Sequence, residues 1–323
     1  MRYRTFGRLG WQVSEVGYGM WGLAAWTGSD DDLSRAALDE AVRLGCNFFD
    51  TAWAYGNGVS EQFLGELVRA HRETRLYTAT KVPPKNLTWP SRREFTLDQV
   101  FPPDHIRRYV EWSLENLGLD AVDLLQFHVW EDAWARDERW QRVVEDLVRQ
   151  RLIGGVGVSI NRWEPENALE TLRTGLVDAV QVIYNIFDQA PEDELFPVCR
   201  ELGVAVIARV PFDEGSLTGH LTRESRFPAG DFRSIYFGPE NLGPTMDHVD
   251  ALVPLVPDDS SLPEMALRFA LTSDDVATVI PGMRRPEHVR ANVRASGRGP
   301  LEPGLMAALR AHRWDRQPTA WSL

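Results

Sequence analysis

Residues 47–61 read Asn-Phe-Phe-Asp-Thr-Ala-Trp-Ala-Tyr-Gly-Asn-Gly-Val-Ser-Glu, a short apolar run that ends abruptly in a carboxylate. The two phenylalanines predict a strand, and Asp50 follows them where a buried charge needs a partner. Tyr55 comes five residues later, ahead of two glycines, on a predicted turn. The stretch therefore predicts a strand end that presents an acid and a phenol, a pair suited to proton chemistry.

Two later apolar runs end in the same manner. Lys81 closes the strand-like run 76–82 just before Pro83 and Pro84, and His128 follows the run 122–127. Parallel α/β enzymes build their sites at the carboxyl ends of strands, so we expect these side chains to meet. A phenol has a pKa of about 10, and Lys81 is the candidate cation to stabilise its phenolate.

These strand ends resemble the aldo-keto reductase superfamily, through Asp50-Thr-Ala-x-x-Tyr55-Gly56, Thr-Lys81 and Asp123-Leu-Leu-x-x-His128, and the resemblance covers nearly the whole chain. Taken singly, each residue has an ordinary structural explanation. The resemblance implies a catalytic tetrad without substitution. In it Tyr55 donates a proton to the carbonyl oxygen, Lys81 lowers the pKa of Tyr55, Asp50 pairs with Lys81, and His128 orients the carbonyl.

The rest of the chain alternates short apolar strands with amphipathic helices, which predicts a parallel sheet covered by helices. Eight strands favour a single (β/α)8 TIM barrel over residues 1–323, with a β-hairpin at 1–14. A doubly wound dinucleotide-binding sheet is the alternative, but glycines 17–22 open no helix as that fingerprint requires. The predicted strands are 13–22, 48–50, 76–82, 122–127, 154–159, 179–184, 204–210 and 277–280. The predicted helices include 30–44 after the first strand and, further along the chain, 165–172, 192–202 and 262–271.

The composition argues against several classes of partner. A formal net charge of −12 opposes binding to nucleic acid or an anionic membrane, and no apolar run has the length of a membrane span. The beginning of the sequence has no signal-peptide pattern, which predicts a cytoplasmic protein. Cys46 and Cys199 are predicted as buried thiols, and the seven histidines lack metal-ligand spacing, which favours a metal-independent enzyme.

The resemblance also implies a nicotinamide cofactor, NADP(H), with NAD(H) as the alternative. Arg209 stands where many members have a tyrosine that stacks on the nicotinamide. The loop expected to cover the pyrophosphate contains Asp213 and Glu214, whose negative charges are unfavourable beside phosphate. Arg284 and Arg285 are the candidate ligands of a 2′-phosphate. The implied cofactor residues are Gly19, Met20, Trp21, Asp50, Ser159, Gln181, Arg209, Pro211, Phe212, Gly215, Leu217, Gly282, Met283, Arg284, His288 and Asn292.

The resemblance implies NADPH-dependent reduction of an aldehyde or ketone to an alcohol by hydride transfer, with a small carbonyl compound as substrate. Its pocket is predicted to involve Trp21, Trp53, Trp89 and Trp130, the segment 226–245, and the tail that ends Trp321-Ser322-Leu323. Two other functions remain open. One is a sugar or polyol dehydrogenase that works in the oxidising direction, and the other is a cofactor-sensing regulatory barrel resembling potassium-channel beta subunits. The oligomeric state is not predicted.

Overall fold

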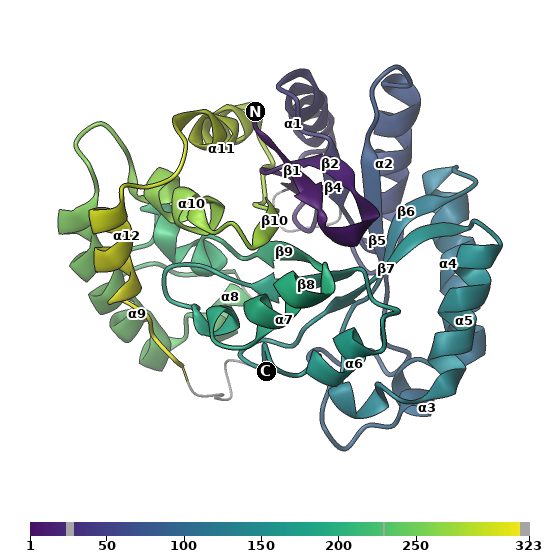
Figure 1. The fold of residues 1–323 in the computed structure, drawn as a ribbon. Helices are drawn as coiled ribbons and strands as arrows, with labels where there is room; N and C mark the ends of the chain where they lie inside the picture. Colours follow the sequence, from purple (N-terminus) through teal and green to yellow (C-terminus); the bar gives the residue numbers. More distant parts are fainter. Residues whose placement is uncertain (24–28, 229, 317–323) are drawn as a thin grey trace.

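A computed structural model describes residues 1–23, 29–228 and 230–316, and the tail at 321–323 lies outside them. Eight parallel strands form one sheet in chain order (Figure 1). Parallel bridges from Val16 to Val279 and from Gly19 to Gly282 join the two edge strands and close the barrel. The predicted (β/α)8 fold is therefore confirmed. The strands are β3 (Tyr18–Gly19), β4 (Phe48–Asp50), β5 (Tyr77–Val82), β6 (Val122–Phe127), β7 (Ile153–Ser159), β8 (Ala179–Ile183), β9 (Ala205–Arg209) and β10 (Val276–Val279).

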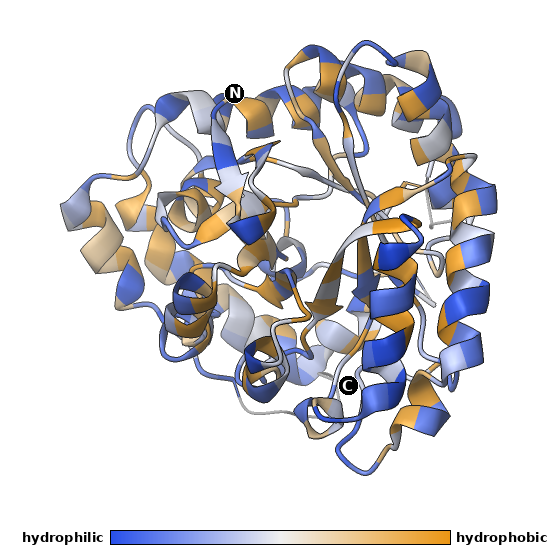
Figure 2. Ribbon diagram, turned by 45° about the vertical axis from the view of Figure 1, so that its right-hand side comes forward, coloured by the Kyte–Doolittle hydropathy of each residue, from blue (hydrophilic) through white to orange (hydrophobic). Residues whose placement is uncertain are grey.

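Helices surround the sheet, and most carry both apolar and polar residues along their length (Figures 1 and 2). One helix follows each strand to cover its outer face: α1 (Asp31–Arg43), α2 (Val59–Ala70), α4 (Pro103–Leu117), α5 (Glu138–Arg149), α6 (Leu169–Arg173), α7 (Leu195–Leu202), α10 (Leu262–Thr272) and α11 (Pro286–Arg298). Four more were not predicted: α3 (Leu97–Val100), α8 (Arg233–Tyr236), α9 (Pro239–Leu252) and α12 (Pro303–Arg310). Among the described residues, no helix is both long and apolar enough to cross a membrane.

Two predicted elements are shorter than expected. The first barrel strand is only Tyr18–Gly19 rather than residues 13–22, because the chain there crosses from the hairpin to the seam of the barrel. A Cβ on Gly19 would lie 2.6 Å from the Ile280 carbonyl oxygen, so this close approach requires glycine. Helix α6 begins at Leu169 instead of 165, where the Asp132 carboxylate accepts hydrogen bonds from two of its first N–H groups.

The predicted hairpin is confirmed as β1 (Tyr3–Phe6) paired antiparallel with β2 (Trp11–Ser14). Its Phe6 is fully buried and stacks on Phe48 of β4, with the ring centroids 5.4 Å apart. The hairpin therefore supplies the apolar floor inside the amino-terminal end of the barrel. A second, larger apolar layer fills the space between the strands and the helices.

Both cysteines are buried free thiols, as predicted. Burial raises the pKa of Cys46 and of Cys199 to about 12, which makes both thiols unreactive at neutral pH.

Candidate active site

Strand alternation places a polar layer above the apolar floor of the barrel. Successive side chains of a strand point to opposite faces, and the inner apolar cluster contains Phe48, Ala79, Leu124, Ala179 and Ile207. The residue two positions further on each of these strands points inward at the carboxyl end. Those residues are Asp50, Lys81, Gln126, Gln181 and Arg209.

Asp50 and Lys81 form a buried ion pair at the centre of this layer. The Lys81 side chain has no exposed surface, and its Nζ lies 2.5 Å from Asp50 Oδ2 and 2.8 Å from the Thr51 carbonyl oxygen. Asp50 Oδ1 accepts hydrogen bonds of 2.8 Å from the amides of Gln126 and Gln181. Burial alone would lower the pKa of Lys81, but the attraction and hydrogen bonds of Asp50 and Tyr55 together outweigh burial and raise that pKa.

Tyr55 and His128 lie next to the ion pair and are both partly exposed. Lys81 Nζ donates to Tyr55 Oη at 3.3 Å, and the rings of Tyr55 and His128 meet edge to face at 5.6 Å between centroids. The structure therefore brings together all four residues of the predicted tetrad. His128 Nδ1 is buried and has no hydrogen-bond partner in the described part of the chain.

Burial shifts the pKa values of the tyrosine and the histidine in opposite directions. Burial raises the pKa of Tyr55, and Lys81 acts in the predicted direction by lowering it, so that the net rise is smaller than burial alone would give. The phenol is fully protonated at neutral pH. Burial, together with the charges of Lys81 and Arg209, lowers the pKa of His128 well below its ordinary value, so the imidazole is neutral.

The residues predicted near the nicotinamide lie on the next three strands. Ser159 ends β7, Gln181 lies on β8 and Arg209 ends β9. The Gln181 side-chain amide nitrogen donates to Asp50 Oδ1 at 2.8 Å and to Gln126 Oε1 at 3.0 Å, so its donor group is already engaged. Sequence reasoning missed Gln126, although its position two residues before His128 follows the inward alternation of β6.

The barrel seam separates two further groups of predicted cofactor residues. Gly19 ends β3 and is followed by Met20 and Trp21, and Gly282, Met283 and Arg284 follow β10 on the other side. Met20 and Met283 are fully buried in the outer core, where the Met20 N–H donates to the Asp50 carbonyl oxygen and the Met283 carbonyl oxygen accepts from the Tyr18 hydroxyl.

A cluster of cations lies just beyond the seam. Arg284 Nη1 is buried and lacks a hydrogen-bond partner among the described residues. Burial and the neighbouring charges of Arg233 and Arg285 lower its pKa. Arg285 is the residue that precedes α11, and its carbonyl oxygen accepts hydrogen bonds from the N–H groups of His288 and Val289 in the first turn. His288 and Asn292 lie on that helix.

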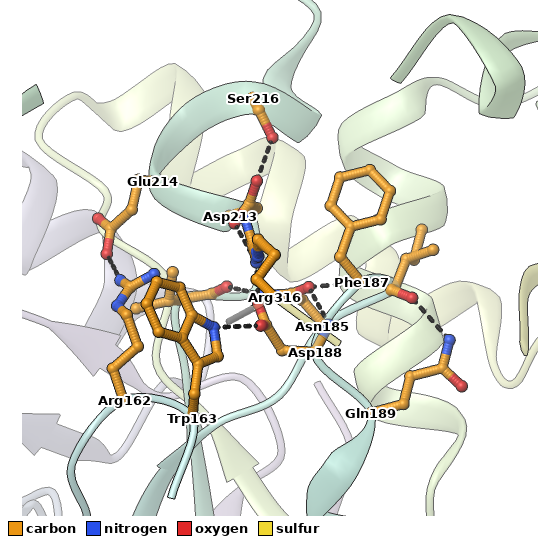
Figure 3. A network of polar contacts seen from close by, with 12 residues as sticks. Arg162, Trp163, Asn185, Phe187, Asp188, Gln189, Asp213, Glu214, Ser216 and Arg316 are labelled. Atoms are coloured by element: carbon orange, nitrogen blue, oxygen red, sulfur yellow. Dashed lines mark hydrogen bonds and ion pairs between the residues drawn. The ribbon is translucent and has the colours of Figure 1, made fainter. Parts of the chain in front are cut away.

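The loop after β9 contains the acidic pair and begins with Pro211 and Phe212. Asp213, Glu214 and Gly215 all have positive φ within a kinked 3₁₀ segment, Asp213–Thr218. Neither carboxylate points toward a free anion site. Glu214 pairs with Arg162, and Asp213 pairs with Arg316 at 2.9 Å (Figure 3). Arginines from other segments thus neutralise the two carboxylates of this loop. Leu217 of the same loop is buried in the core.

Arg316 is the residue of this network that sequence reasoning had least means to find. Its guanidinium is nearly fully buried and lies 2.5 Å from Asp188 (Figure 3). It also donates to the Tyr236 hydroxyl at 2.9 Å. It binds loops that follow two different strands, and no local motif marks it. Arg162 was missed for the same reason, because its partner Glu214 is distant in sequence.

The four predicted pocket tryptophans lie in different environments. Trp89 is 40% exposed and meets the His128 ring edge to face at 5.8 Å, and Trp21 is 42% exposed against Phe232. Trp53 packs on Tyr109 of α4.

Trp130 does not reach the site. It is fully buried among Phe127, Trp134 and Trp140, and its indole N–H donates to Thr171. The prediction of Trp130 as a pocket residue is therefore corrected. Its predicted loop folds back into the core, where an aromatic cluster excludes water.

Comparison with known proteins identifies the family. Residues 15–313 match the family model described as the aldo/keto reductase family. The chain belongs to this family. The resemblance noted in the sequence is thus confirmed.

Relatives of this family member include named reductases, which confirms the predicted enzyme class. The NADH-specific methylglyoxal reductase of Escherichia coli is 28% identical, over 88% of this chain and 90% of its own. The aldo-keto reductase yakc [NADP(+)] of Schizosaccharomyces pombe is 29% identical, over 88% and 84%.

Two solved structures share the fold of this family member. The holo form of the aldo-keto reductase AKR11C1 from Bacillus halodurans superposes with a TM-score of 0.79 at 27% identity, over 100% of each chain. The glycerol dehydrogenase AKR11B4 from Gluconobacter oxydans gives a TM-score of 0.80 at 26% identity, over 96% of this chain and 94% of that one.

Proposed function

We propose that the protein reduces the carbonyl group of a small aldehyde or ketone to an alcohol, with Tyr55 as the proton donor. The observation that carries this proposal is the contact of Tyr55 Oη with Lys81 Nζ, 3.3 Å, beside the ring of His128. Asp50 and Lys81 are buried, whereas the phenol and the imidazole are partly exposed. Tyr55 and His128 are therefore the two groups that a substrate oxygen can meet.

The chemistry of these residues fits carbonyl reduction. Negative charge develops on the carbonyl oxygen as its carbon is reduced, and a donor must meet that charge. The raised pKa of Tyr55 keeps its proton in place until then. Lys81 stabilises the phenolate that remains, and Asp50 keeps Lys81 charged in the buried layer. The neutral imidazole of His128 donates a hydrogen bond that orients the carbonyl.

A nicotinamide cofactor, when bound, supplies the hydride. The buried Arg284 Nη1, which lacks a partner among the described residues, fits a phosphate oxygen, since an unpaired buried donor is costly without one. Arg285 stands at the amino-terminal end of α11, which favours an anion. We therefore propose NADP(H), with NAD(H) as the alternative, because the names of the two relatives point to different cofactors.

The remaining cofactor contacts are also part of the proposal. The proposed backbone contacts are those of Gly19, Met20, Gly215, Leu217, Gly282 and Met283. The proposed side-chain contacts are those of Trp21, Ser159, Gln181, Phe212, His288 and Asn292. Pro211 shapes the loop after β9. Trp21, Trp53 and Trp89 remain the proposed pocket residues.

Two other functions use the same residues. Oxidation of a sugar or polyol would run the proton transfer backwards, and the glycerol dehydrogenase of similar fold favours testing it. A regulatory barrel would bind cofactor without useful turnover.

One experiment separates the three functions. Cofactor oxidation and reduction are followed on panels of aldehydes, ketones and their alcohols, with NADPH and NADH. We expect faster reduction than oxidation, and a loss of about 10² or more in Tyr55→Phe with cofactor affinity unchanged, because the ring is kept and only the donor is lost. Cofactor binding without turnover on either panel would leave the regulatory function.

The wider setting follows from the same proposal. A small-molecule carbonyl compound is the proposed partner, and the acidic composition makes nucleic acid an unsuitable one. A cytoplasmic location and a single domain over residues 1–323 stay predictions.

A further inference from the structure

Arg209 ends β9 and points into the barrel at the level of the tetrad. Ala205 and Ile207 on the same strand belong to the inner apolar cluster, so alternation turns Arg209 inward as well. Its Nη2 donates to the Ile160 carbonyl oxygen at 3.0 Å. Its Nε is buried and has no partner within the described ranges. One neutral oxygen is a sparse environment for a buried guanidinium.

The carboxylates near Arg209 are committed to other cations. Glu214 pairs with Arg162 and Asp50 pairs with Lys81 (Figure 3 shows the first pair). In the part of the chain that the structure describes, Arg209 itself forms no ion pair. Burial and the repulsion of Arg162 lower its pKa to about 10, which leaves it charged at neutral pH.

The field of Arg209 reaches the reacting groups. Its charge helps to lower the pKa of both Tyr55 and His128. A carbonyl oxygen held by these two groups places its carbon beside them, and a hydride donor must then lie within van der Waals contact of that carbon. The donor ring therefore lies inside the same field, whatever the substrate.

The two redox states of a nicotinamide differ by one charge at this position. The reduced ring is neutral and the oxidised ring is a cation. A partly buried guanidinium that forms no ion pair among the described residues repels the cation and leaves the neutral ring almost unaffected. Arg209 thus acts on the difference between the two states.

We propose that Arg209 makes this site select the redox state of its cofactor, so that the reduced form binds more tightly than the oxidised form. This inference rests on the proposed function, since it requires a nicotinamide cofactor. The selection favours reduction over oxidation, because it speeds departure of the oxidised product and disfavours its return. At the effective dielectric of a partly buried site, one such charge changes the affinity ratio by roughly tenfold or more.

The test measures binding, not turnover. Dissociation constants of NADPH and NADP⁺ are determined by calorimetry for the wild type, Arg209→Gln, Arg209→Lys and a second neutral variant, Arg209→Tyr. Arg200→Gln is the matched control. It removes the same charge from α7 near the amino-terminal end of β9, where Arg200 pairs with Asp275.

We expect the neutral variants to lower the ratio of the NADP⁺ to the NADPH dissociation constant by about tenfold, mainly through tighter NADP⁺ binding. Arg209→Lys and Arg200→Gln should keep the wild-type ratio. An unchanged ratio in both neutral variants, or an equal change in Arg200→Gln, overturns the role of Arg209. Failure of the wild type to bind either NADP(H) or NAD(H) overturns the proposed function as well, which distinguishes the two failures.

Discussion

Replacement of Lys81 by methionine tests the buried ion pair most directly. Methionine keeps much of the apolar length of the side chain but removes the charge, so the Asp50 carboxylate stays in the barrel without its cation. Breaking a buried pair on one side typically costs 3–5 kcal/mol. Asp50 keeps the two 2.8 Å hydrogen bonds from Gln126 and Gln181, which places the expected loss at the lower end, about 3 kcal/mol.

Thermal and urea unfolding of the purified variants measure this loss. About 3 kcal/mol corresponds to a drop in Tm of roughly 4 °C for a chain of this size. The double variant Asp50→Asn, Lys81→Met should recover part of it, because an amide oxygen can still accept from Gln126 while no buried charge remains. Neither variant should reduce carbonyl substrates.

The pH dependence carries a sign that checks the same reasoning. Folding raises the pKa of Lys81, so its stabilisation is fully present below the ordinary lysine pKa of about 10.4 and is lost as the pH rises through the higher folded value. The stability gap between wild type and Lys81→Met should therefore be constant near neutrality and narrow only in strong alkali. A single variant as stable as the wild type, or a double variant no more stable than the single one, would refute the assignment.

Other substitutions separate core, cofactor and pH effects. Trp130→Ala should cost about 3–5 kcal/mol in urea unfolding with KM unchanged, whereas Trp89→Ala should change KM at nearly constant stability; the reverse pattern would restore Trp130 to the pocket. The double variant Arg284→Ala, Arg285→Ala should lose about one to two decades of NADPH affinity in titrations, and its binding should be less salt-dependent; equal losses for NADH would contradict a phosphate role. Folding lowers the pKa of His128, which favours the neutral imidazole in the folded state. The stability that this neutral group contributes is therefore present above about pH 6.5 and is lost on acidification, because the unfolded chain then takes up the proton first. His128→Gln should flatten the fall of Tm between pH 7 and 5, and an unchanged slope would exclude this contribution.

The barrel and the tetrad could be predicted because their signals are local. Each strand that ends near Asp50, Lys81 or His128 can be recognised from a short apolar run followed by a polar residue. Parallel strands bring their carboxyl ends to the same end of the barrel. The family resemblance then fixed the set. The Gln126 and Gln181 hydrogen bonds to Asp50 follow from alternation, once the register between strands is known.

The remainder depends on contacts between distant segments. Nothing near Asp213 and Glu214 in the sequence indicates that Arg316 and Arg162 neutralise them. Trp130 resembles Trp89 as a loop tryptophan, yet one packs in the core and the other borders His128. The net direction of the Tyr55 pKa shift was also beyond the sequence, because it depends on how far burial outweighs one nearby charge.

The seam and the neighbouring pairing of β3 with β4 are the shortest joints of the barrel, because each has only two bridged residue pairs. Hydrogen bonds at the seam run from Gly17 to the Val279 carbonyl oxygen at 2.8 Å and from Gly19 to that of Pro281 at 3.1 Å. Other neighbouring strands, such as β6 and β7, pair over five residues. A closed barrel has no free edge, so local opening is expected to begin where its ladder is shortest.

The proposed cofactor residues 19–21 and 282–284 lie on the two sides of the seam. A ligand that contacts both sides binds only the closed form, and at a hundred times its dissociation constant it raises the free energy of opening by about 2.7 kcal/mol. Amide hydrogens at the seam would then exchange with solvent about a hundredfold more slowly. The rate of amide hydrogen exchange at Gly17 and Gly19 therefore reports whether the proposed cofactor site is occupied, even in a variant that has lost all catalysis.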